Sequence, residues 1–189
     1  MNRSRRSIII LAFGMFLALT HCAKEELATV SLAKIPVTTN SSLAAEEFQR
    51  GMAYANTLQT VEAATHFRLA LDADPTFASA WLNLAYVSPG TALFVSYLDS
   101  AKAHASKASE GEQLIILAAK YGFEGNNTKQ EKSLQKLVEL FPGDENALLL
   151  LGNYYFGLRQ YRQAIQSYHQ ATLVNNNLAI LHNQLGYSQ

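Results

Sequence analysis

The chain has 189 residues, 49% of them hydrophobic and 16% charged, a composition that excludes a largely disordered protein. Its formal net charge is zero, but Arg3, Arg5 and Arg6 stand in the first 21 residues, which contain no acid. Taking these three from the 15 basic residues leaves 12 against 15 acidic ones, a net charge of −3. Such a mildly acidic body lacks the basic surface of a nucleic-acid-binding protein, so we expect no nucleic-acid partner.

The first 21 residues have the pattern of a signal peptide. The three arginines precede an apolar run from Ile8 to Leu19, which is shorter than the roughly 20 residues that a membrane-spanning helix needs. The only cysteine, Cys22, follows shortly after that run. A lone cysteine excludes an internal disulfide and a zinc site built on several thiolates.

The segment Leu19-Thr20-His21-Cys22 resembles the lipobox of bacterial lipoproteins. The resemblance implies cleavage before Cys22, a diacylglycerol on its sulfur, and a membrane-anchored protein that faces the periplasm. His21 departs from the family, which has Gly, Ala or Ser at that position. Ala23 follows the cysteine, and by the same resemblance this favours the outer membrane over the inner one. The alternative is an ordinary or uncleaved signal peptide with an unmodified Cys22.

Residues 22–43 are predicted to form the lipidated cysteine and a flexible tether. This stretch contains Pro36 and the polar run 38–42, and it shows no sustained helical periodicity. The polar run also offers an N-cap to the helix that follows.

From Ala44 onward the sequence repeats with a period of about 34 residues. Large apolar residues recur at i, i+3, i+4 and i+7 and therefore share one helix face. A small residue stands at the same place in each repeat: Gly51, Ala85, Ala118, Gly152 and Gly186. A second helix with a small–aromatic–small pattern follows, clearest at two places: Ala63, Phe67 and Ala70, and Ala164, Tyr168 and Ala171.

This pattern resembles the tetratricopeptide repeat (TPR) from about residue 44 to the end. The resemblance implies an all-α, right-handed solenoid of antiparallel helix pairs. We expect four units, at about 44–77, 78–110, 111–144 and 145–178, and a partial fifth at 179–189. The chain is thus predicted to be truncated in its fifth repeat, and self-association through that uncapped helix is a further expectation.

Two places depart from the family pattern. Glu47 and Arg50 stand where the family prefers large apolar residues. In the second unit Ser88-Pro89-Gly90 interrupts the helical stretch, and the helix predicted over 91–107 lacks the small–aromatic–small pattern. This unit is either a TPR-like pair with altered packing, which we favour, or a change in solenoid curvature.

No motif indicates catalysis, a metal site or a cofactor. The histidines do not share a helical turn, and no glycine-rich phosphate loop is present. Ser109-Glu110-Gly111-Glu112 is interpreted as a helix start with acids in its first turn rather than an acid/base site.

The TPR resemblance also implies where a partner binds, because positions 2, 5, 9 and 12 of each unit line the concave groove in that family. The candidate residues are apolar or aromatic with a few amides: Phe48, Met52, Leu82, Tyr86, Ile115, Asn146, Leu149, Asn153 and Phe156. Such a surface suits an extended or helical peptide. For each residue the alternative is packing between units.

The sequence therefore predicts a non-catalytic interaction scaffold, an exported TPR lipoprotein that binds a peptide or protein in its groove. The alternative is an N-terminal adaptor fragment of a larger TPR protein, with an enzymatic or signalling domain beyond Gln189. Sequence downstream of that residue would discriminate between the two.

Overall fold

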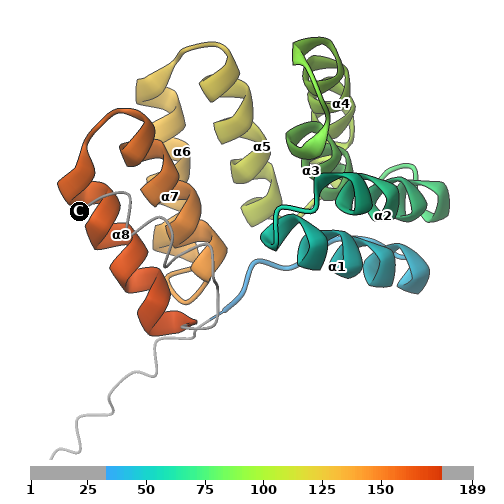
Figure 1. The fold of residues 1–189 in the computed structure, drawn as a ribbon, viewed down its shortest axis with the longest axis horizontal. Coiled ribbons are helices and arrows are strands. Elements are labelled where there is room, and N and C mark those ends of the chain that lie inside the picture. The colour runs from blue at the N-terminus through green and yellow to red at the C-terminus, as the bar shows by residue number, and fades with distance from the viewer. Residues whose placement is uncertain (1–32, 176–189) are drawn as a thin grey trace, which may run out of the picture. The chain divides into compact units, whose positions relative to one another are not determined.

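The computed structural model describes residues 33–175 (Figure 1). The signal peptide, Cys22 and the partial fifth unit lie outside the described residues. Between residues 33 and 175 the chain forms α-helices and one short 3₁₀ turn, and this range contains no strand. No helix within it is both long and apolar enough to cross a membrane.

The helices form four consecutive pairs. They are α1 (Ser42–Asn56) with α2 (Thr60–Ala73), α3 (Ala78–Val87) with α4 (Thr91–His104), α5 (Glu110–Phe123) with α6 (Asn127–Leu140), and α7 (Glu145–Gly157) with α8 (Tyr161–Val174). Contacts are most extensive within each pair, and neighbouring pairs meet through α2 and α3, α4 and α5, and α6 and α7. This arrangement confirms the predicted all-α solenoid of helix pairs, with bounds close to the predicted units.

Glycines let the helices approach closely in the first and fourth pairs. A Cβ built on Gly51 would lie 2.5 Å from Cε1 of Phe67, and one built on Gly152 would lie 2.5 Å from Cδ1 of Tyr168. Both rings are fully buried. Each glycine therefore leaves the space that the aromatic ring of the second helix fills, which is what the repeated pattern predicts.

Three of the four pairs turn in the same way. Leu58, Gly125 and Arg159 have φ values of 61°, 70° and 60°, so each lies in the left-handed region. The residue after each one donates its N–H to a tyrosine carbonyl five residues earlier, at 2.8–3.0 Å, as in a Schellman motif: Gln59 to Tyr54, Asn126 to Tyr121, and Gln160 to Tyr155. The same backbone turn thus recurs although only one of the three positions is glycine.

The second pair differs from the others. Its turn is Ser88-Pro89-Gly90, with Gly90 at φ 82°, and its second helix ends in a 3₁₀ turn over Ala105–Lys107. The predicted helix over 91–107 is therefore observed as α4 and this turn. Only Leu98 and Ala101 of α4 are buried, and α4 contacts the next pair less than α2 or α6 does. At the junction between the second and third pairs, α3 and the 3₁₀ turn therefore also contact α5.

Candidate functional site

The nine candidate groove residues all lie on the first helices of the pairs, and three of them are buried. Phe48, Leu82 and Leu149 are 5%, 2% and 9% exposed. The ring of Phe48 packs against those of Phe67 and Phe77, with centroid separations of 5.7 Å and 4.8 Å. These three side chains lie in the hydrophobic clusters that hold the helices together, so they form a floor beneath any bound partner.

The other six candidates remain accessible to solvent. The half-buried ones are Met52, Ile115 and Phe156, and the exposed ones are Tyr86, Asn146 and Asn153. Oδ1 of Asn153 accepts a hydrogen bond of 2.8 Å from the hydroxyl of Tyr168. This bond orients the amide and uses its oxygen, while an amide nitrogen can donate two hydrogen bonds. The accessible surface therefore combines apolar contact area with oriented amide groups.

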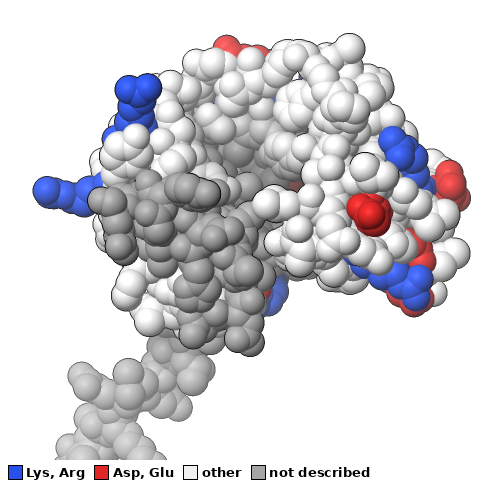
Figure 2. All heavy atoms as spheres, in the orientation of Figure 1, with Lys and Arg blue, Asp and Glu red and all other residues white. Residues whose placement is uncertain are grey.

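Aromatic rings extend the surface around Tyr86 onto neighbouring helices. The ring of Phe94 lies 6.1 Å from that of Tyr86 and 5.7 Å from that of Phe123, and Phe123 is 51% exposed. Phe94 and Phe123 are not among the residues predicted from the sequence, because neither falls on a groove position of its unit. In Figure 2 most of the described surface on the drawn face is uncharged, with basic and acidic side chains mainly near its edges and one acidic side chain facing the viewer.

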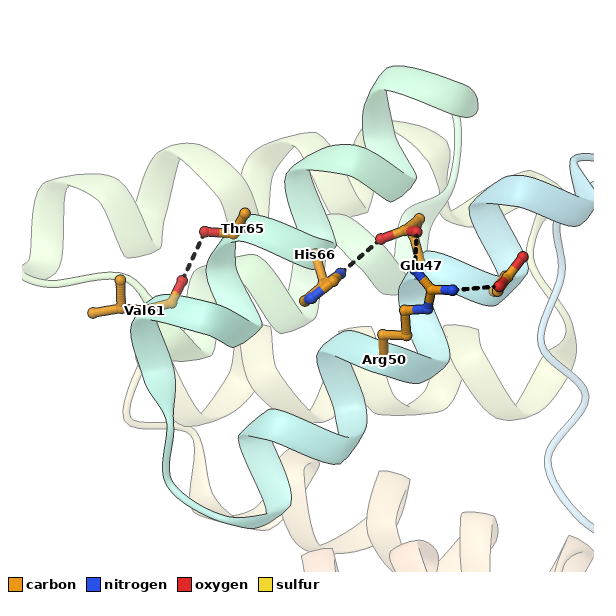
Figure 3. A network of polar contacts seen from close by, with 6 residues as sticks. Glu47, Arg50, Val61, Thr65 and His66 are labelled. Carbon is orange, nitrogen blue, oxygen red and sulfur yellow. Dashed lines mark hydrogen bonds and ion pairs between the residues drawn. The ribbon is translucent and has the colours of Figure 1, made fainter.

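A polar network links α1 to α2 at the position where the family pattern prefers apolar residues. Glu47 is only 6% exposed, and its carboxylate lies 3.0 Å from Nη1 of Arg50 and 2.6 Å from Nδ1 of His66. Figure 3 shows the carboxylate between the guanidinium of its own helix and the imidazole of α2. The ring of Tyr54 stacks on His66 at 5.2 Å. This network replaces an apolar contact with an ionic one and serves the packing of the first pair.

A second polar site follows the turns between pairs, at the N-terminal ends of α5 and α7. Residues 34–39, which we call the strap, lie against these turns. The backbone N–H of Ile35 donates to Oδ2 of Asp144 at 2.9 Å, and the N–H of Thr38 donates to Oε1 of Glu112 at 3.1 Å. Lys34 forms an ion pair with Glu145. The strap thus contacts the third and fourth pairs although it directly precedes the first.

Glu112 is the most heavily bonded of these acceptors. It is 3% exposed and forms a capping box with Ser109, and it also accepts the hydroxyl of Ser79 at 2.6 Å. Burial alone would raise the pKa of Glu112. The hydrogen bonds from Ser79, Thr38 and Ser109 outweigh burial and hold the pKa below its ordinary value of 4.5. The carboxylate is therefore a stable anion that holds α3, α5 and the strap together.

The strap differs from the flexible tether expected over residues 22–43. Its hydrogen bonds and ion pair to α5, α7 and their turns fix residues 34–38, and residues 22–32 lie outside the described residues. These contacts join positions 71 to 111 residues apart, so no local pattern indicates them. The helix start predicted at Ser109–Glu112 is observed, but its role as a seat for the strap was not predicted.

In the part of the chain that the structure describes, no cluster of three or more His, Cys, Asp or Glu side chains is placed to hold a metal ion. Buried side-chain nitrogen and oxygen atoms in that part all have hydrogen-bond partners.

The described residues define a class of protein, an all-α solenoid of stacked helix pairs with an accessible row of side chains on its first helices. A family model for the tetratricopeptide repeat matches residues 145–178, which comprise α7 and α8. The other three pairs repeat the same helix–turn–helix arrangement. The chain thus contains a tetratricopeptide repeat at residues 145–178, within a solenoid of four helix pairs.

Solved structures similar to this chain include MamA, with 17% identity, 77% of this chain and 80% of that chain covered, and a TM-score of 0.43. Another is YrrB, described as a TPR protein with an unusual peptide-binding site, with 17% identity, coverage of 77% and 75%, and a TM-score of 0.42. A third is the first TPR of Spaghetti (RPAP3) bound to an HSP90 peptide, with 16% identity, coverage of 81% and 95%, and a TM-score of 0.34. No curated protein matches the chain.

Proposed function

We propose that this chain is an exported interaction scaffold that holds a peptide or protein along its first helices. The observation that carries the proposal is the accessible row on α1, α3, α5 and α7, in which apolar and aromatic side chains on all four helices are joined by two amides on α7. Aromatic and apolar anchors supply contact area, and amides bond the polar backbone of an extended or helical segment. Catalysis has no part in this proposal.

The row is tested by site-specific photo-crosslinking in cells. A photoreactive phenylalanine analogue at Tyr86 or Phe156 is expected to capture a protein partner. The matched control is the same analogue at Leu173, which is 75% exposed on the second helix α8. Equal capture from all three positions, or capture from Leu173 alone, would contradict binding along the first helices.

We further propose that Cys22 anchors the scaffold to a membrane facing the periplasm. The support is the sequence pattern, in which a basic start and a short apolar run lead to the only cysteine. The acyl chains added to a lipoprotein suffice for stable anchoring, since a single chain gives only marginal binding. Ala23 favours the outer membrane by resemblance to Gram-negative lipoproteins.

Mass spectrometry of the chain expressed in a Gram-negative host tests the anchor. We expect a mature N-terminus at Cys22 with added acyl mass, and loss of that mass in Cys22→Ser. An unmodified thiol at Cys22 in the wild-type chain would refute the lipoprotein proposal and leave the scaffold proposal standing.

A further inference from the structure

The turns between successive helix pairs lie along one edge of the solenoid, which we call the turn edge. Each of these turns, or the first helical turn after it, carries a carboxylate that accepts a hydrogen bond from the strap: Asp74, Glu112 and Asp144. Ile35 bonds to Asp144 at the start of α7, and Thr38, three residues later, bonds to Glu112 in the first turn of α5. Three residues of extended chain span about 10 Å. Three residues of extended strap therefore reach from the acceptor of the fourth pair to that of the third.

The seat also includes a side-chain pocket. A Cβ built on Gly111 would lie 2.8 Å from Cγ2 of Ile35 and 2.9 Å from Cε2 of Phe141. Only glycine at position 111 leaves room for both the branched side chain of Ile35 and the ring of Phe141. The half-buried Ile35 thus packs against Gly111 at the position whose N–H bonds to Asp144.

The remaining strap residues fit the edge in the same register. The hydroxyl of Ser109 donates to the carbonyl of Pro36 at 2.9 Å, and the hydroxyl of Thr39 donates to Oδ2 of Asp74 at 2.6 Å. Proline holds its own φ at about −65° and steers the residue before it to extended conformations. Val37, by contrast, is 41% exposed and points to no comparable partner among the contacts of the described residues.

The acceptors keep their other hydrogen bonds without the strap. Asp144 also accepts the backbone N–H groups of Asn146 and Ala147, at 2.9 Å and 3.0 Å. Glu112 keeps its bonds from the backbone N–H of Ser109 and the hydroxyl of Ser79. Because each carboxylate is held by its own turn, withdrawal of the strap leaves a site that is already in its binding geometry.

We propose that this turn edge is a binding site for an extended peptide, and that the chain's own strap occupies it in cis. The ligand it takes has a basic residue, a β-branched apolar residue and a proline in succession, followed after one further residue by two threonines. The site is separate from the row of side chains on the first helices, and its occupancy by the strap keeps other peptides of this pattern out.

The test uses the full chain and a labelled synthetic peptide of residues 33–41, AKIPVTTNS. Ile35→Asp with Thr38→Pro should release the strap, since it empties the pocket, sets a carboxylate beside Asp144 and removes the N–H that bonds to Glu112. We expect this double variant to bind the peptide saturably in fluorescence anisotropy, with an affinity at least about tenfold above that of the wild-type chain, a difference of about 1.4 kcal/mol.

Two controls separate the site from a general effect of added charge or exposed chain. Val37→Asp makes the same kind of change at the outward position and should leave peptide binding as weak as in the wild type. Gly111→Val added to the double variant fills the pocket and should abolish binding. Equal binding by the wild type and the double variant, or no binding by a folded double variant, would overturn the proposal.

A further arm covers the outcome in which the double variant does not fold. The single variant Thr38→Pro removes the bond from its N–H to Glu112 and the bond that its hydroxyl accepts from the N–H of Ser109, and it leaves the pocket filled. It should bind the peptide more tightly than the wild type does. If both variants lost their helical circular dichroism, the strap would be an integral part of the fold and the proposal would fail.

Discussion

At the scale of single residues, the close contact of Gly152 with Tyr168 sets the packing of the fourth pair. Gly152→Ala would place a methyl group against the buried ring and should lower the free energy of unfolding by about 1–3 kcal/mol. Gly157→Ala, in the same helix with no atom within 4 Å of its built Cβ, is the control and should not destabilise the protein. Urea unfolding measures both, and equal stability of the two variants would contradict the packing described.

The left-handed residues of the three similar turns give a prediction of opposite sign. Leu58 and Arg159 lie in a left-handed conformation that costs a residue with a Cβ about 1–2 kcal/mol. Glycine avoids this steric cost, but it loses more conformational entropy on folding, which offsets part of the gain. Leu58→Gly and Arg159→Gly should each raise the free energy of unfolding by about 0.5–1 kcal/mol. Gly125→Ala should lower it. Thermal unfolding of the three variants checks the signs, and destabilisation by both glycine substitutions would refute the argument.

Tyr168 makes stability depend on pH in the alkaline range. Burial raises the pKa of Tyr168 to about 12, above its ordinary value of 10.0. The native state thus keeps a proton that the unfolded chain loses, so this contribution is fully present below pH 10 and is lost as the pH rises toward 12. Tyr168→Phe should remove this part of the slope, while losing about 0.5–1.5 kcal/mol at neutral pH with the bond to Asn153. Urea unfolding at several pH values measures it, and an unchanged slope in the variant would count against the assignment.

At the scale of helices, α4 should be the least stable second helix among those described. Both α4 and α2 have 14 residues. However, α4 buries only Leu98 and Ala101, whereas α2 buries five residues including Phe67. Helices with few buried contacts open at lower free energy. Hydrogen exchange with mass spectrometry should show α4 exchanging faster than α2, and protection of α4 equal to that of α2 would contradict this expectation.

The helices were predictable from sequence where the residues that define them lie close together in the chain. The pattern of Gly152, Ala164 and Tyr168 spans one helix pair, and the irregular second pair is marked by Ser88-Pro89-Gly90. The strap was not predictable, because its composition is that of a linker and its contacts lie far away in sequence. Among the groove candidates, the helical period places Phe48 and Tyr86 on the first helices, but it does not tell that the first is buried and the second exposed. That difference depends on the neighbouring helix.

At the scale of the whole solenoid, the strap spans the junction between the second and third pairs, through its bonds to Asp74 and Glu112. Repeat arrays unfold cooperatively only as far as their interfaces hold neighbouring units together. In Ile35→Asp, unfolding followed by the single tryptophan, Trp81 of α3, should precede or follow the unfolding seen by circular dichroism. In the wild type and in Val37→Asp the two transitions should coincide. Coincident transitions in Ile35→Asp as well would show that the junction holds without the strap.

The strap also has a consequence for the order in which this chain is completed during synthesis. Each helix pair can form once its own residues have left the ribosome, because its contacts are local. The strap is made before any helix of the described solenoid, yet its partners Glu112 and Asp144 emerge more than 70 residues later. The earliest described segment of the chain is thus among the last to dock, and its docking marks the arrival of the fourth repeat.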